Sequence, residues 1–489
     1  MSMRYKWQIA FRTTQIILLI ALNIIFLFGG ATIFRSDSVV GASLQRIRIA
    51  AQTQQFQELI VLGAYIFFLT FCLLQYYKSP GKFLNIYNRD LWLAIFLSLA
   101  TINYMVRGVS DLDNTEAIMC LMGPACVQFV VWSKTLGRTA ANENLFEMVS
   151  IGVTAVVLWY ISVFIGDFRH IFAYLKMIRW SGPWGNPNIL GLLMGAGIAL
   201  MVSLGLEIRV LALRIVSSTL SSRAIYLLGT SLCALAAAFL FRGLYHSYSR
   251  GAWVATFCGM VYLAISAGKK GQDCDSSRER LVRKTVFWTF VAAVSIAILA
   301  FWHFHDTRWP IVRRAFSMTN SADFSWRNRV AAWSGAVQIM ADHPWSGTGW
   351  GRAQLLYTHY YRPPKVSEGS AFRMNDYLKI GATLGIPALL SFAMYIWLSF
   401  TRLDVRRLDT VESNFIKEED SMCIPSGFLY IGCRTATVIL LIGFWFDGGF
   451  FVAATSFVFW IVIEMGRKQQ HTVRLKCNPF VETPNVRVA

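Results

Sequence analysis

The chain has 489 residues, of which 55% are hydrophobic and only 15% are charged, and its formal net charge is +19. Soluble domains carry about 25% charged residues, so this composition excludes an ordinary soluble domain and indicates a polytopic membrane protein. No cysteine falls in a predicted outer loop, so the sequence predicts neither a disulfide framework nor a cysteine-based metal site.

Apolar runs of about 20 residues are typical of membrane-spanning helices, and the sequence contains about twelve such runs by that measure. They lie at residues 14–34, 58–77, 91–106, 116–133, 147–166, 188–206, 224–241, 251–268, 285–303, 378–400, 427–446 and 448–465. The predicted fold is an all-α polytopic membrane protein with a large, partly helical outer loop between spans nine and ten.

Positive charges predict the orientation. Lys and Arg cluster near the N-terminus, in alternate connectors and in the tail, at 78–89, 134–138, 207–223, 269–284, 402–417 and after residue 466. Because short loops rich in cations face the cytoplasm, both termini are expected there, and the loop at 304–377 is expected on the outer face. The first span lacks a small-residue cleavage site, so we expect a retained anchor rather than a signal peptide.

The cations expected on the outer face are nearly all Arg. A planar guanidinium suits phosphate and carboxylate better than the point charge of Lys, so part of the net charge could hold an anion. The alternative is that these side chains reach out to lipid headgroups. One short outer loop carries Asp111-Leu112-Asp113, but two acids in such a loop are more often simply solvated, so no metal site is predicted.

The first motif in chain order is Gly185-Asn186-Pro187-Asn188, which leads into the sixth span. Asn186 and Asn188 can cap the following helix, because Asn side chains accept from free N–H groups at a helix start. Pro187 is well suited to the first turn of that helix. A helix N-terminus at the outer boundary also favours a bound anion. The simpler alternative is a plain cap that positions the span.

The second motif is Ser249-Arg250-Gly251-Ala252-Trp253, at the start of the eighth span. Arg250 lies at the outer edge of a helix, where an unpaired charge is costly, and an ionisable group at that depth indicates a functional site. Its expected partner is an acid such as Asp306 or Asp323, or a phosphate of the ligand.

The long outer loop is predicted to contain an amphipathic helix from Ser325 to about Ala341, which ends at Asp342-His343-Pro344 because Pro cannot continue it. The apolar residues recur at helical spacing, at Val330, Trp333, Val337 and Met340. Arg329 and Trp333 share a face of this helix, and Arg327 lies two positions before Arg329 in the chain. Gly347, Gly349 and Gly351 then allow a close approach of the chain to a neighbouring segment. His359, Glu368 and Asn375-Asp376 follow before the tenth span.

Taken in order, these pieces resemble the O-antigen ligase/polymerase superfamily, which includes O-antigen ligases, Wzy-type polymerases and bacterial O-oligosaccharyltransferases. The similar residues are GNPN (Gly185–Asn188), SRGAW (Ser249–Trp253), the segment from Arg329 to Gly351, and NDYL with GIP (Asn375–Leu378 and Gly385–Pro387). The resemblance covers about residues 182–387 and does not extend to the first five spans or the tail.

The resemblance implies a glycosyltransferase in a bacterial inner (plasma) membrane that needs no metal and no cofactor. Its donor would be an undecaprenyl-pyrophosphate-linked glycan, and its acceptor a hydroxyl of a glycan, of lipid A–core or of a protein. The implied ligands of the donor pyrophosphate are Arg250 and Arg329, with Arg327 beside them. Asn186, Asn188, Trp333 and Asn375 are expected to position the donor or the loop.

One position departs from the ligase pattern. In ligases a His directly precedes the Asn-Asp and is proposed to engage the acceptor hydroxyl, whereas this chain has Met374. Because Met cannot take a proton, the candidate bases are Asp376, Glu368 and His359. The departure favours a polymerase or a divergent transferase over a ligase.

The sequence therefore predicts a transmembrane scaffold at residues 1–177, a ligase-like catalytic region at 178–400 and C-terminal helices with a cytoplasmic tail at 401–489. The alternatives to a ligase-like transferase are a polysaccharide polymerase, a non-enzymatic transporter or flippase of lipid-linked glycans, and an inactive relative that only binds such a glycan. The absence of a visible internal repeat argues against a transporter. Membrane lipids are an expected partner, and nucleic acid is not.

Overall fold

The computed structural model describes residues 84, 86–107, 171–174, 177–214, 220–269, scattered positions between 281 and 299, 324–364, 375–401 and 427–466. These residues are 84% helical, as the predicted fold class requires. The predicted spans at 14–34, 58–77, 116–133 and 147–166 lie outside the described residues, so the count of twelve stays a prediction. One short hairpin, β1 (Ile171–Tyr174) with β2 (Met177–Trp180), was not predicted.

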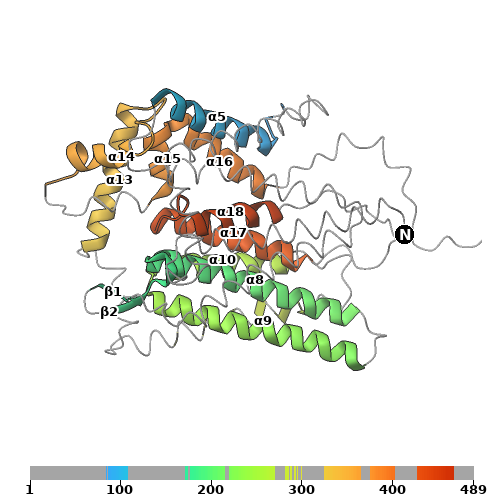
Figure 1. Cartoon of the computed structure of the whole chain (residues 1–489). Coiled ribbons are helices and arrows are strands. Elements are labelled where there is room, and N and C mark those ends of the chain that lie inside the picture. Colours follow the sequence, from blue (N-terminus) through green and yellow to red (C-terminus); the bar gives the residue numbers. More distant parts are fainter. Residues whose placement is uncertain are drawn as a thin grey trace, which may run out of the picture.

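One group of long helices packs side by side in Figure 1. It consists of α8 (Pro187–Arg214), α9 (Leu220–Ser247), α10 (Arg250–Lys269) and α17 (Phe428–Phe446). Each is long and apolar enough to cross a membrane, and the chain is a membrane protein. Gly191 and Gly195 of α8 face Ala252 and Thr256 of α10 so closely that a Cβ would overlap them, which lets these two helices approach each other closely.

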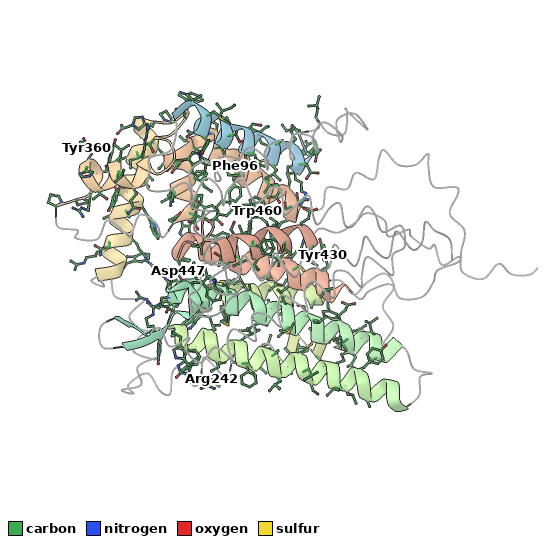
Figure 2. All side chains as sticks on the ribbon, viewed as in Figure 1. Phe96, Arg242, Tyr360, Tyr430, Asp447 and Trp460 are labelled. Atoms are coloured by element: carbon green, nitrogen blue, oxygen red, sulfur yellow. The ribbon has the colours of Figure 1, made fainter. Side chains whose placement is uncertain are left out.

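A second group contains α5 (Arg89–Arg107), α16 (Ile386–Phe400) and α18 (Ala453–Met465). Its interior is aromatic, and Figure 2 shows Phe96 and Trp460 within it. The rings of Phe392 and Phe450 lie 5.1 Å apart, and those of Phe450 and Trp460 lie 5.9 Å apart. Phe450 belongs to the turn between α17 and α18, so this core fixes the position of that turn.

The remaining elements gather at one end of the long helices (Figure 1). They are the β1–β2 hairpin, the short 3-10 helix η2 (Gly182–Trp184), α13 (Phe324–Asp342), α14 (Arg352–Leu356), the π-helical turn η4 (Tyr357–Tyr361) and α15 (Asp376–Leu384). The same end carries the first residues of α8 and α10 and the last residues of α17.

The prediction of one continuous span at 378–400 was wrong. The helix breaks at Gly385, where φ is +91°, and α15 and α16 lie on either side. The break is held by the preceding loop, because Ile386 N–H donates to the Pro344 carbonyl (2.8 Å) and Gly349 N–H donates to the Thr383 carbonyl (3.0 Å). Gly347 lies against the Thr383 backbone, where a Cβ would not fit. The close approach predicted for these glycines is therefore confirmed.

The predicted loop helix is confirmed, since α13 runs from Phe324 to Asp342. Its packed face agrees with the predicted one only in part: Met340 is buried and Trp333 half-buried, as predicted, but the two valines are not. Val330 and Val337 are 45% and 53% exposed, whereas the buried positions include Asn328, Ala332 and Ile339. Small side chains let α13 lie close to α15 and η4, and this close fit, rather than the bulk of the valines, decides the face.

Candidate functional site

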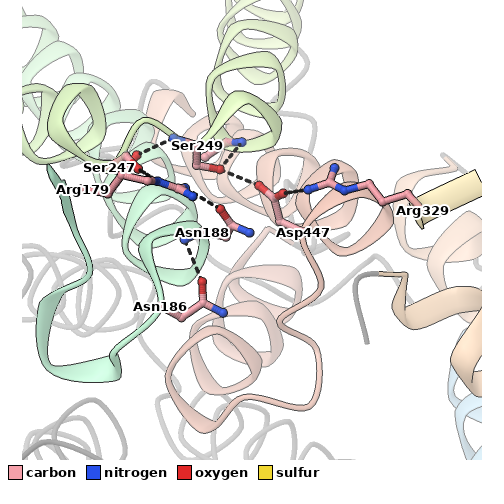
Figure 3. Close-up of polar contacts among 8 residues, drawn as sticks. Arg179, Asn186, Asn188, Ser247, Ser249, Arg329 and Asp447 are labelled. Atoms are coloured by element: carbon pink, nitrogen blue, oxygen red, sulfur yellow. Dashed lines mark hydrogen bonds and ion pairs between the residues drawn. The ribbon is translucent and has the colours of Figure 1, made fainter. Parts of the chain in front are cut away.

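The site is organised around Asp447, the residue that follows α17 (Figure 3). Its side chain is only 2% exposed. Oδ1 accepts from Arg329 Nη2 at 3.1 Å, and Oδ2 accepts from the Ser249 hydroxyl at 2.6 Å. Gly448 and Gly449, both at positive φ, turn the chain directly after it. Asp447 thus joins the end of α17 to α10 and α13, which come from distant parts of the sequence.

The turn Ser249–Gly251 lies directly against this carboxylate. Ser249 caps α10, because its Oγ accepts from Ala252 N–H at 3.2 Å while its hydroxyl donates to Asp447. A Cβ at Gly251 would overlap the Asp447 carboxylate, so only glycine permits this contact. Arg250, half-buried, stands between these two residues as the first residue of α10. Ser249 and Gly251 of the predicted motif therefore contact one buried acid.

Arg329 and Trp333 lie one turn apart on α13 and both present buried N–H groups. The Arg329 side chain is 15% exposed; its Nε and the Trp333 Nε1 are buried without a hydrogen-bond partner among the described residues. The Trp333 ring lies 6.0 Å from that of Trp445, near the end of α17. A buried unpaired donor costs free energy and calls for an explanation. A bound ligand with oxygen acceptors would supply one.

The motif at the start of α8 is tied to the same turn through Arg179 (Figure 3). Arg179 Nε donates to the Ser247 carbonyl and its Nη2 donates to Asn188 Oδ1, both at 2.9 Å. Asn186 Oδ1 accepts from Asn188 N–H at 2.9 Å, so the predicted cap of α8 is confirmed. Both asparagines hold protein groups, which fits a positioning role.

Asn375 and Asp376 act within the protein at the start of α15. Asn375 Oδ1 accepts from Leu378 N–H at 3.0 Å and caps the helix, while its Nδ2 is buried without a partner in the described part of the chain. The buried Asp376 carboxylate accepts from Phe450 N–H at 2.7 Å. Asp376 therefore anchors the turn that follows Asp447.

The other predicted residues are less closely placed. Arg327 is exposed on α13, and His359 is exposed on η4. In the part of the chain that the structure describes, neither side chain forms a hydrogen bond or ion pair with Asp447, whose partners are Ser249 and Arg329. Glu368 and Met374 lie outside the described residues, as do Asp306 and Asp323. The structure thus brings together Arg329, Trp333 and the Ser249–Gly251 turn. It does not identify the base that takes the acceptor proton.

Asp447 is the functional candidate that the sequence interpretation missed. In the sequence it is the residue between the last two predicted spans, 427–446 and 448–465. The available signal was an acid beside two glycines at the outer boundary, on the side where the basic motifs were expected. Among the described residues, no group of three His, Cys, Asp or Glu side chains could hold a metal ion.

No curated protein matches this chain. The family model described as O-Antigen ligase matches residues 232–393, which is 393 − 232 + 1 = 162 of the 489 residues. The matched segment contains the Ser249–Gly251 turn, α13 and the start of α15, and it excludes Asp447. The match supports a similarity of residues 232–393 to the O-antigen ligase/polymerase superfamily.

Proposed function

We propose that this membrane protein transfers a glycan from a polyprenyl-pyrophosphate donor, such as undecaprenyl pyrophosphate, to a hydroxyl on the outer face of the membrane. The acceptor hydroxyl would belong to a sugar, to lipid A–core or to a protein. The O-antigen ligase domain supports a ligase- or polymerase-like transferase. The donor and the side of the membrane are our inference from the basic motifs and the topology.

The observation that carries this proposal is the convergence of the two basic motifs on Asp447. Arg329 is held by the carboxylate through one nitrogen, which fixes its guanidinium and leaves the Nε donor available. Arg250 is placed at the N-terminus of α10, where the helix dipole also favours an anion. A fixed guanidinium beside a helix N-terminus suits a pyrophosphate.

In the proposed reaction, the acceptor oxygen attacks the anomeric carbon of the first sugar. The bond from that carbon to the pyrophosphate oxygen breaks, and the pyrophosphate leaves with the electron pair. N–H groups that are already oriented toward the pyrophosphate stabilise the charge that develops on this leaving group. The hydroxyl proton must pass to a base. Asp376 is a weaker candidate than the sequence suggested, because one of its oxygens accepts from Phe450 N–H.

The polymerase is the main alternative within this proposal, because Met374 replaces the His expected of a ligase. A transporter would be expected to carry charges within its spans, and Arg434 lies within the predicted span at 427–446. In the structure the Arg434 guanidinium donates to the Ser399 and Gly466 carbonyls at 2.9 and 3.2 Å. It therefore satisfies carbonyls at the ends of α16 and α18, which accounts for the charge without transport.

The test uses purified protein in nanodiscs with a labelled undecaprenyl-pyrophosphate glycan and candidate acceptors. Release of undecaprenyl pyrophosphate together with a lengthened acceptor is expected. Arg329→Ala should abolish turnover, since loss of one donor to a developing charge costs about 100- to 1,000-fold. Arg352→Ala, an exposed Arg on α14, is the matched control and should retain activity.

The glycan product distinguishes a ligase from a polymerase. Transfer of a preformed long chain to the final acceptor identifies a ligase, whereas growth of the lipid-linked chain by repeat units identifies a polymerase. Full turnover by Arg329→Ala would contradict the assigned site. Movement of the donor across a vesicle membrane without any cleavage would contradict the transferase and favour a transporter.

A further inference from the structure

Five aromatic rings form a continuous series beside the Ser249–Gly251 turn, and we call this series the aromatic ridge. Its members, in order, are Trp180, His246, Tyr245, Tyr248 and Trp253. The successive ring centroids are 4.3, 5.2, 6.1 and 6.3 Å apart. The ridge runs from β2, across the end of α9, to the first turn of α10. None of these rings is used in the mechanism described above.

The ridge lies at the level of the polar end of the helices. Arg242 is exposed near the end of α9 and its guanidinium carbon lies 5.6 Å from the centre of the Trp180 ring. Figure 2 shows Arg242 at the same end of the molecule as Asp447. An exposed Arg is not stable in the apolar interior of a membrane. This end of the ridge therefore meets water or the headgroup layer.

The ridge is fixed in place and yet accessible. Tyr245 is 36% exposed, and Tyr248 and Trp253 are half-buried. Trp253 Nε1 donates to the Leu244 carbonyl at 3.0 Å, which holds the indole. Tyr248 has φ +48° and is the non-glycine residue at positive φ within the described chain. Such strained residues cluster at ligand sites, which is consistent with a ligand-binding role for this ring.

We propose that the aromatic ridge binds the sugar rings of the donor glycan that lie next to the pyrophosphate. This inference rests on the proposed function. Aromatic rings present an apolar face to the C–H face of a sugar, while Tyr hydroxyls and ring N–H groups can bond its hydroxyls. The first sugar is covalently attached to the pyrophosphate. The last two rings of the ridge, Tyr248 and Trp253, flank Arg250 in the chain, so the ridge lies where the glycan must continue.

A membrane-interface belt is the competing explanation, because Trp and Tyr are enriched at that level. Belt residues need only face the lipid from their own helices. Here the rings contact one another across three elements, and Arg179 ties the Trp180 strand to the same turn through the Ser247 carbonyl. That link makes the ridge one unit with the basic site. We therefore favour a glycan over a lipid headgroup.

The experiment compares two probes on the purified protein in nanodiscs: undecaprenyl pyrophosphate without sugar, and the same lipid carrying the native glycan. Wild-type protein should bind the glycan-bearing lipid at least about tenfold more tightly, a difference of about 1.4 kcal/mol. Tyr245→Ala should lose most of this difference and bind the bare lipid pyrophosphate as wild type does. Tyr245→Phe keeps the ring and should retain most of it.

Tyr360→Ala is the matched control, since Tyr360 is an exposed tyrosine on η4 outside the ridge. Trp180→Ala tests the far end of the ridge independently. Equal binding of the two probes by wild type, or an unchanged difference in Tyr245→Ala and Trp180→Ala, would overturn the inference alone. A changed dependence on anionic nanodisc lipids, with donor binding unaffected, would identify a headgroup belt and also overturn it. Failure of wild type to bind either probe would instead refute the proposed function on which the inference rests.

Discussion

The strongest prediction concerns Asp447→Asn. In the folded protein the carboxylate is 2% exposed and carries the charge that balances Arg329, itself only 15% exposed. The amide of Asn has nearly the same shape and can still accept from the Ser249 hydroxyl, but it removes the negative charge. The substitution therefore leaves a largely buried guanidinium without its counter-ion.

The magnitude follows from this burial. Removing one partner of a fully buried ion pair costs about 3–5 kcal/mol. The partial exposure of Arg329 reduces the cost to about 2–3 kcal/mol, with solvent screening one side of the pair. The effect on transfer should be larger than the effect on folding. When Arg329 is no longer held in place, the transition state loses an oriented hydrogen-bond donor. Such a donor is worth about 100- to 1,000-fold in rate.

Two measurements on the same purified sample separate these effects. Thermal unfolding in detergent gives the loss of stability, and donor turnover below the unfolding temperature gives the rate for folded protein. Asp342→Asn is the matched control, because Asp342 lies on α13 but is exposed and accepts only from Tyr361 in the described contacts. A folded Asp447→Asn protein with turnover within about twofold of wild type would refute the argument that this ion pair positions Arg329.

Three further predictions concern Gly251 and Asp376 near the site and the ion pair of Glu464 with Arg89. Gly251→Ala should sharply reduce turnover, because its Cβ would overlap the carboxylate next to it, whereas Gly229→Ala on α9 meets only ordinary contacts and should remain active. Asp376→Asn should keep measurable turnover if this side chain anchors Phe450 N–H; loss of the chemical step with unchanged donor binding and unchanged stability would instead restore it as the acceptor base. Glu464→Gln should lower the free energy of unfolding, because it removes the buried carboxylate that pairs with Arg89; the loss should stay below the about 3–5 kcal/mol of a fully unpaired buried charge, since Asp90 remains 3.3 Å from Arg89 Nε. Adding Arg89→Met should recover part of that loss, and chemical denaturation in mixed micelles measures both.

The parts of the site that sequence could predict are local ones. The cap at Asn186, the end of α13 at Asp342 and the shared face of Arg329 and Trp333 all depend on residues within a few positions of one another. Helix periodicity and cap chemistry operate at that range, so the prediction succeeded. The predicted packed face of α13 was wrong at Val330 and Val337, because burial there depends on which neighbour is close enough to exclude bulky side chains.

Asp447 could not be paired with Arg329 from the sequence. The two residues are 118 positions apart, and no local rule relates the end of one span to the middle of an outer loop. The partners predicted for Arg250, which are Asp306, Asp323 or a ligand phosphate, stay a prediction, because both acids lie outside the described residues. Asp447 comes from the end of α17 and is brought to the start of α10 by the packing of α10 against α17.

The same long-range packing explains why the glycine-rich loop belongs with the basic site although it does not touch it in the described contacts. Thr348 N–H donates to the Ala382 carbonyl at 2.9 Å, so the loop fixes the end of α15. The start of α15 carries Asp376, which holds Phe450 N–H and thereby the turn that begins at Asp447. A shift of the loop would therefore be passed along a short rigid helix to the residue that orients Arg329. This connection explains why the glycines occur together with the arginines in this chain. It does not require the glycines to contact the substrate.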